Sequence, residues 1–131
     1  MESGKTILLV DDDRDFVASN RDLLEAYGYA VLTAYDGSSG FETAQREHPS
    51  LIVLDVIMNH VTEGFETAKK IRELPELRET KILMVSAATP EMRLWTSSAV
   101  SDGEMSVEHL LEKPIDPAKF IATIEEILEN D

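Results

Sequence analysis

The residues best suited to chemistry lie at or just after short apolar runs, and they are Asp11, Asp12, Asp55, Ser86 and Lys113. Carboxylate oxygens are the ligands that hard divalent cations prefer, and a carboxylate can also act as a nucleophile and form an acyl phosphate. A lysine ammonium and a serine hydroxyl donate hydrogen bonds to phosphate oxygens. Residues of these types predict metal-assisted phosphoryl transfer, provided that the fold brings them together.

Acids gathered in one pocket repel one another. Two unit charges about 4 Å apart interact by roughly 4 kcal/mol at an effective dielectric constant of about 20. A bound cation offsets that repulsion, and Mg²⁺ suits a site of one or two carboxylates that leaves room for water and phosphate oxygens. We therefore expect Mg²⁺, or another divalent cation such as Mn²⁺, beside Asp11, Asp12 and Asp55.

The elements that would position these residues alternate along the chain. Apolar, β-prone runs predict strands at residues 6–10, 30–34, 51–54, 81–85 and 109–112. Amphipathic spacing, N-capping residues and helix-ending Gly or Pro predict helices at residues 13–27, 37–48 and 64–74, from 90 onward and from 117 onward. Strands that are apolar throughout and alternate with such helices are typical of an α/β fold, in which helices cover both faces of a parallel sheet.

In such a sheet, ligands bind beyond the carboxyl ends of the strands, at the point where the strand order switches direction. The first strand is followed by Asp11 and Asp12, and the third, fourth and fifth are followed by Asp55, Ser86 and Lys113. We therefore expect all these side chains to meet at one edge of the sheet.

Composition narrows the function further. The chain has 131 residues and no linker or low-complexity stretch, so we expect a single domain over residues 1–131 with no output domain. The net charge of −14 disfavours direct binding to nucleic acid or to an anionic membrane. The lack of cysteine and of an apolar targeting segment favours a cytoplasmic setting.

Four segments of the sequence resemble the signatures of response-regulator receiver domains of two-component systems: Leu9–Asp13, Leu51–Asp55, Met84–Ala87 and Leu111–Pro114. The resemblance covers nearly the whole chain. It implies a doubly wound, flavodoxin-like (βα)5 three-layer sandwich with a parallel sheet in the order 2-1-3-4-5. It also implies a cis bond before Pro114.

The resemblance assigns roles by position. It implies that Asp55 accepts the phosphoryl group, that Asp12 binds the metal directly and Asp11 mostly through water, and that Ile57 lends its backbone carbonyl. Ser86 and Lys113 would contact the phosphoryl group. The expected donor is a sensor histidine kinase or a histidine phosphotransfer protein, or a small phosphodonor. The chain would phosphorylate and dephosphorylate itself without turning over a separate substrate, and would signal through its fourth helix, fifth strand and fifth helix to an unknown downstream protein or output domain.

The sequence departs from the family pattern in three places. After Asp55, the loop at residues 58–64 lacks the usual Pro, and Gly64 comes one residue late. Leu110 stands where a Tyr or Phe usually serves as a rotamer switch, and the segment at residues 90–108 is longer than usual. We therefore expect the segment that contains Trp95, rather than Leu110, to rearrange.

Other interpretations of the same residues remain open. Residues 11–13 also fit a helix N-cap, and Asp13 is expected to be no more than that. Asp11 and Asp13 fit the Asp-x-Asp nucleophile motif of a phosphatase, although the chain is short for such an enzyme. A degenerate receiver that only binds partners is a third alternative. The histidines, His48, His60 and His109, lack metal-ligand spacing and are expected at the surface.

Overall fold

The fold alternates strands and helices, and the computed structural model describes it over residues 5–56, 58, 63–87, 89–101 and 109–129. The strands are β1 (Thr6–Val10), β2 (Ala30–Ala34), β3 (Leu51–Asp55), β4 (Lys81–Ala87) and β5 (His109–Lys113). The helices are α1 (Arg14–Ala26), α2 (Gly37–Glu47), α3 (Glu63–Glu73), α4 (Pro90–Ser101) and α5 (Pro117–Glu129), with a short 3-10 helix η1 (Pro75–Leu77) after α3. Every predicted strand and helix is present.

The strands form one sheet in the order β2-β1-β3-β4-β5, and each neighbouring pair is parallel. The predicted doubly wound order is therefore confirmed. The order reverses direction between β1 and β3, so that the carboxyl ends of these two strands flank the switch point.

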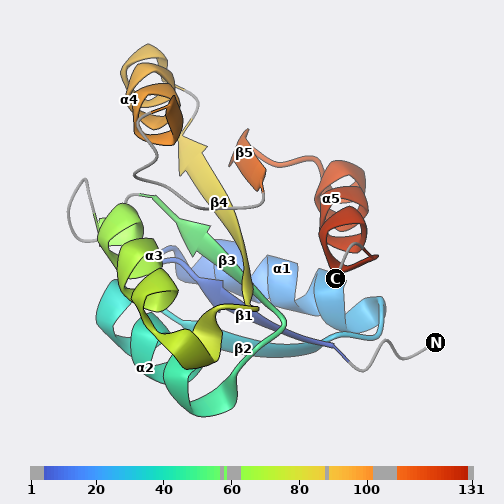
Figure 1. Cartoon of the computed structure of the whole chain (residues 1–131). Coiled ribbons are helices and arrows are strands. Elements are labelled where there is room, and N and C mark those ends of the chain that lie inside the picture. The colour runs from blue at the N-terminus through green and yellow to red at the C-terminus, as the bar shows by residue number, and fades with distance from the viewer. Residues whose placement is uncertain (1–4, 57, 59–62, 88, 102–108, 130–131) are drawn as a thin grey trace.

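Alternate residues of each strand enter two separate cores. Leu8 and Val10 of β1 face a cluster that includes Ala44 of α2, whereas Ile7 and Leu9 face a cluster that includes Phe120 of α5. Accordingly, α2, α3 and α4 lie on one side of the sheet and α1 and α5 on the other (Figure 1). Because β1, β3 and β4 are covered on both faces, the central residues of each are a continuous apolar run, as the sequence pattern predicted.

Helix ends are set by local capping. Asp13 caps α1 by accepting hydrogen bonds from the backbone N–H groups of Asp15 and Phe16, both at 3.1 Å. Gly28 follows α1 with a positive φ of 92°, which an L side chain rarely adopts. Thr89 caps α4 by accepting from the Met92 N–H at 3.1 Å. These caps confirm the predicted ends.

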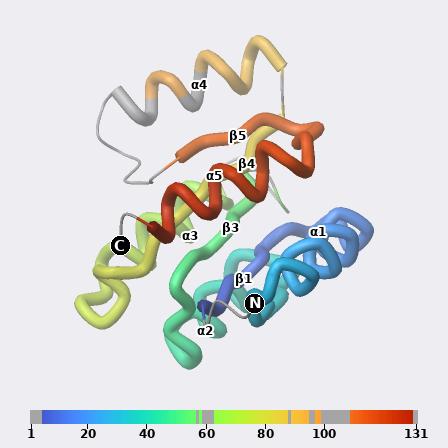
Figure 2. Tube along the Cα trace, turned by 90° about the vertical axis from the view of Figure 1, so that its right-hand side faces the viewer, coloured from blue at the N-terminus to red at the C-terminus, as the bar shows by residue number. Residues whose placement is uncertain are grey.

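Helix α4 lies at the far end of the molecule from α2, and α5 runs along the sheet beside β5 (Figures 1 and 2). Met92 anchors α4 in the core, while Leu94 is 75% exposed. The side chains of Trp95 and Ala99 lie outside the described ones. Within the described residues, no helix has the length and apolar character needed to cross a membrane.

Candidate functional site

The strand ends bring the predicted side chains to one edge of the sheet. Asp11 follows β1, Asp55 ends β3 and pairs in register with Val85 of β4, and Lys113 ends β5 opposite Ala87. Ser86, 1% exposed, lies between these two register pairs. Strand β4 runs two residues further than predicted, so Ser86 lies inside the strand and does not follow it.

Three carboxylates converge in this pocket. Asp11, Asp12 and Asp55 each offer an oxygen, and these atoms lie within 4.8 Å of one another. Asp11 and Asp55 are buried, at 2% and 6% exposure, whereas Asp12 is exposed. The three carboxylates thus form one site, with Asp11 and Asp55 in its buried part and Asp12 at its solvent-exposed side.

Lys113 supplies the positive charge. Its Nζ donates a hydrogen bond to Asp11 Oδ2 at 2.9 Å and lies 3.6 Å from Asp55 Oδ2. Burial is the largest single influence on the pKa of Lys113 and lowers it. The hydrogen bond to Asp11 and the charges of Asp55, Asp11 and Asp13 together outweigh burial and raise the pKa above its usual value. The Lys113 ammonium is therefore protonated near neutral pH.

Asp11 is held on both of its oxygens. Oδ2 accepts from Lys113, and Oδ1 accepts from the Asp13 backbone N–H at 2.9 Å. The exposed Asp12 is thus better placed to bind a cation directly. One ammonium faces three carboxylates in this set, so negative charge remains in excess.

The donor set fits a hard divalent cation. It consists of carboxylate oxygens, which Mg²⁺ and Mn²⁺ accept, and its exposed side leaves room for water and phosphate oxygens. Asp11, Asp12 and Asp55 would hold the ion. The expected carbonyl ligand, Ile57, lies outside the described residues.

The side chains of Asp11 and Asp13 have different partners and do not face one common site. Asp11 points toward Lys113, whereas Asp13 is exposed and caps α1. The predicted capping role of Asp13 is confirmed, and this geometry does not favour the Asp-x-Asp interpretation. His48 and His109 are exposed, as expected, and His60 lies outside the described residues. The Lys113–Pro114 bond is cis, as the resemblance implied.

Sequence reasoning missed three contacts that the structure shows. The Lys113 ammonium lies 4.5 Å from the centre of the Phe16 ring, a residue that helical spacing marked only as apolar. The buried Glu63 accepts a hydrogen bond from the Gly37 backbone N–H and so joins the starts of α3 and α2. The Gly64 N–H donates to the Val56 carbonyl at 2.9 Å. The first two contacts have no local sequence signal, because each joins segments that are distant in the sequence.

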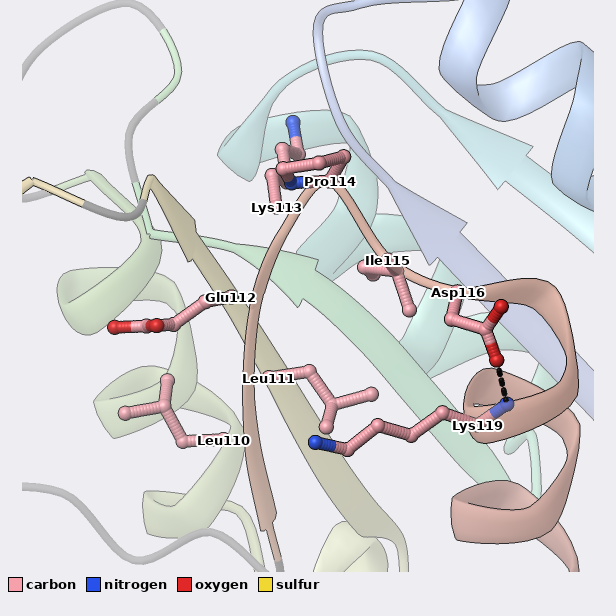
Figure 3. A pocket seen from close by; sticks show the side chains of 8 residues that line it. All are labelled: Leu110, Leu111, Glu112, Lys113, Pro114, Ile115, Asp116 and Lys119. Atoms are coloured by element: carbon pink, nitrogen blue, oxygen red, sulfur yellow. Dashed lines mark hydrogen bonds between the residues drawn. The ribbon is translucent and has the colours of Figure 1, made fainter.

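Two hollows flank the pocket. One, of about 700 Å³, lies between α1 and the segment after β5, and its apolar lining includes Phe16, Leu23, Ile115 and Pro117. The other, of about 560 Å³, follows β5 and the start of α5. Figure 3 shows Leu110 and Glu112 on one side of β5 and Leu111 on the other.

Fold and site together define a doubly wound α/β protein with an acidic pocket, closed by one lysine, at the switch point of its sheet. The response regulator receiver domain model matches residues 7–125. The chain belongs to this family and is a phosphoacceptor signalling domain. Receiver domains of this kind act with histidine kinases in two-component systems.

Similar proteins agree with this assignment. The alkaline phosphatase synthesis transcriptional regulatory protein PhoP of Bacillus subtilis is 34% identical over 127 residues, which are 97% of this chain and 50% of PhoP. The polar-differentiation response regulator DivK of Brucella ovis is 29% identical, over 95% of this chain and 96% of DivK. This chain thus spans half the length of the first relative and nearly all of the second.

Solved structures agree as well. The chemotaxis response regulator CheY4 of Vibrio cholerae has a TM-score of 0.80 and 30% identity, over 95% of this chain and 98% of that one. A response regulator receiver domain protein from Methanospirillum hungatei has a TM-score of 0.80 and 27% identity, over 96% and 94% of the two chains.

Proposed function

We propose that Asp55 is the residue that accepts the phosphoryl group, with Asp11 and Asp12 completing a Mg²⁺ site and Lys113 and Ser86 contacting the transferred group. The observation that carries this proposal is the carboxylate cluster, whose oxygens lie within 4.8 Å of one another, closed by Lys113 at 2.9 Å from Asp11 and 3.6 Å from Asp55. Asp55 ends the central strand β3, so its carboxylate is held on a rigid element.

The reaction moves one phosphoryl group. A carboxylate oxygen of Asp55 forms a bond to phosphorus while the bond from phosphorus to the donor's nitrogen breaks, and the bonding electron pair leaves with that nitrogen. Bound Mg²⁺ would neutralise charge on the phosphate oxygens. Lys113 donates to one phosphate oxygen and Ser86 to another. Water later cleaves the acyl phosphate, which releases inorganic phosphate and regenerates the Asp55 carboxylate, so no separate substrate is turned over.

The proposed donor is a sensor histidine kinase or a histidine phosphotransfer protein. It would dock in the 700 Å³ hollow, because Phe16, Leu23, Ile115 and Pro117 offer apolar contact there. Lys113 also lines this hollow, so a phosphohistidine seated in it would lie beside the acidic pocket. The proposed output surface consists of α4, β5 and α5, where a downstream protein would read the phosphorylated state.

Phosphorylation would bias this surface through β4 and β5. The modification adds a charge of roughly −1.5 to −2, and Ser86, the proposed contact for the phosphoryl group, pairs in register with Glu112 of β5. Glu112 in turn forms a two-pronged ion pair with Arg93 of α4, at 2.6 and 3.0 Å. A shift of Ser86 therefore has a continuous route to α4.

The test uses a small phosphodonor and intact mass. Incubation with phosphoramidate and Mg²⁺ should raise the mass by one phosphoryl group, and EDTA or Asp55→Asn should prevent the gain. Asp22→Asn, at an exposed site on α1, is the matched control and should be labelled like the wild type. Labelling of a folded Asp55→Asn variant would contradict the proposal, and a wild type that is never labelled would favour a module that only binds partners.

A further inference from the structure

Phe16 is the aromatic neighbour of the pocket's only described cation, and the local structure fixes its place. It is the third residue of α1, and its backbone N–H donates to the capping carboxylate of Asp13 at 3.1 Å. Its carbonyl accepts a hydrogen bond from the Asn20 side chain at 2.7 Å. The half-buried ring packs against the core cluster on the α1 and α5 side of the sheet, with the Lys113 ammonium 4.5 Å from its centre.

We propose that Phe16 is a positioning residue for phosphoryl transfer, which holds the Lys113 ammonium at the pocket through a cation–π contact. This inference rests on the proposed function above. It assigns a role in the reaction to a side chain that would touch neither the phosphoryl group nor the metal ion.

The physical reason lies in how Lys113 must be shared. An ammonium on a flexible four-carbon stem has three N–H donors and loses rotamer freedom when it is held in one place. Asp11 already takes one donor, at 2.9 Å. A second hydrogen-bonding neighbour would compete with the phosphate oxygens for the rest. The face of Phe16 attracts the charge without accepting a conventional hydrogen bond, so it restrains the ammonium and leaves donors for the incoming group.

The ring also lies outside the acidic cluster. Asp11 is both the hydrogen-bond partner of Lys113 and a member of the carboxylate set that fits a cation, so its charge is shared between two roles. Phe16 has no such second role at the metal site. Its contact can therefore keep Lys113 in place whether Asp11 binds the ammonium or the metal ion.

A structural role alone makes a different prediction, and the chain offers a matched control. Arg14, also in the first turn of α1, stacks on the Tyr35 ring at 4.0 Å. Tyr35 also packs against the same core cluster as Phe16, but its ring holds Arg14 and not Lys113. Tyr35→Leu thus removes a comparable cation–π contact without removing the partner of Lys113.

The experiment measures the rate of labelling by phosphoramidate at saturating Mg²⁺, because a small donor needs no protein docking surface. Phe16→Leu should slow labelling about three- to fivefold, the size expected of a partly exposed cation–π contact. Phe16→Tyr, which keeps the aromatic face, should stay within about twofold of the wild type, as should Tyr35→Leu. Circular dichroism checks that each variant is folded.

A double-mutant cycle shows whether the effect runs through Lys113. In the Lys113→Ala background, Phe16→Leu should no longer change the residual rate. An NMR measurement adds a readout of the contact itself: the Lys113 side-chain protons should show an upfield ring-current shift that Phe16→Leu abolishes and Phe16→Tyr retains.

The outcomes separate this inference from the proposed function. Suppose that the wild type is labelled and that Phe16→Leu reacts at the wild-type rate, or that Phe16→Leu slows labelling by the same factor whether position 113 is Lys or Ala. Either result would show that the positioning role is wrong while the proposed function stands. A folded Phe16→Tyr variant that is as slow as Phe16→Leu would also overturn the positioning role. A wild type that takes no phosphoryl group overturns both.

Discussion

At the scale of single residues, Asp11 and Asp12 are adjacent in sequence but differ in environment. Asp11 is buried and uses both oxygens, one for Lys113 and one for the Asp13 backbone. Asp12 is exposed at the mouth of the pocket. A cation that binds at this site would therefore exchange water for an Asp12 oxygen more readily than displace Lys113 from Asp11.

This difference predicts how the two acids contribute to metal binding. Asp12→Ala should weaken Mg²⁺ binding by about tenfold, which corresponds to the loss of roughly one charge-assisted contact. Asp11→Ala should weaken it less. The measurement is the rise of the thermal unfolding midpoint with Mg²⁺ concentration, which reports affinity for the folded state. Asp15→Ala, at an exposed site on α1, should behave like the wild type. Loss of the Mg²⁺ effect in Asp11→Ala but not in Asp12→Ala would contradict this account.

At the scale of elements, α2 begins with a charge-dependent cap. Asp36 accepts hydrogen bonds from the backbone N–H and the hydroxyl of Ser39, both at 2.8 Å. The backbone hydrogen bond from Ser39, followed by its hydroxyl, holds the pKa of Asp36 below its usual value. A lowered carboxyl pKa means that the ionised form stabilises the folded state.

The cap therefore predicts a pH-dependent stability difference. Asp36→Ala should cost about 1 kcal/mol near neutral pH, the usual value of an N-cap. Because the pKa of Asp36 is lowered on folding, its charge-dependent contribution is complete above the unfolded-state pKa and is lost as the pH falls through the folded-state value. Urea unfolding of both proteins at pH 7 and at about pH 3 should show the gap narrowing. The control is Asp36→Ser, which keeps an N-cap that carries no charge. A stability difference between the wild type and Asp36→Ala that widens in acid would refute the charge-dependent cap.

The start of α3 depends on a glycine. A Cβ on Gly64 would overlap the backbone carbonyl of Asp55 and lie 2.6 and 2.7 Å from the Val56 Cα and carbonyl oxygen. Gly64→Ala should therefore cost roughly 2–3 kcal/mol, typical of overpacking against backbone that cannot yield. It should also slow labelling by phosphoramidate, because the strain falls on the end of β3 that carries Asp55.

The matched control for Gly64 lies far from the pocket. Gly28 needs a positive φ of 92°, so Gly28→Ala should cost about 1 kcal/mol through backbone strain alone. Both variants should unfold more readily, but only Gly64→Ala should change the labelling rate. Equal labelling rates in the two folded variants would show that the β3–α3 junction does not shape the site.

The α4–β5 pair tests the switch. Leu110 is half-buried against the core cluster that contains Met84 and Met92, so it can pack but has no hydroxyl to present. Beryllofluoride with Mg²⁺, which mimics a phosphoryl group, should change the fluorescence of Trp95, the only tryptophan of the chain. Ser86→Ala should abolish that change. Leu110→Ala should lower the free energy of unfolding by about 1–2 kcal/mol through lost packing, yet it should keep most of the Trp95 fluorescence change. Loss of that change in a folded Leu110→Ala variant would show that position 110 takes part in the switch.

At the scale of the whole molecule, the net charge supports the proposal that a cation binds at the site. The chain carries a net charge of −14, and three acids meet where the sheet directs ligands. Approach of an anionic phosphodonor to such a surface is unfavourable unless a cation and Lys113 offset the repulsion. The excess of acids and the proposed need for Mg²⁺ thus belong together.

The sequence predicted what depends on periodicity and on parallel-strand geometry. It placed Asp11, Asp55 and Lys113 at one sheet edge because the carboxyl ends of parallel strands share that edge. It could not predict which acid is buried, the ring of Phe16 beside Lys113, or the Arg93–Glu112 ion pair. These depend on the packing of helices against strands that are remote in sequence, and local patterns do not encode it.

The most direct test of the central claim locates the phosphoryl group on the chain. After labelling with phosphoramidate and Mg²⁺, borohydride reduces an aspartyl phosphate to homoserine, and tandem mass spectrometry of the digest then identifies the converted residue. Our account predicts homoserine at position 55 and nowhere else. Conversion at position 11, 12 or 13 would show that a different carboxylate is the nucleophile and would contradict the role proposed for Asp55.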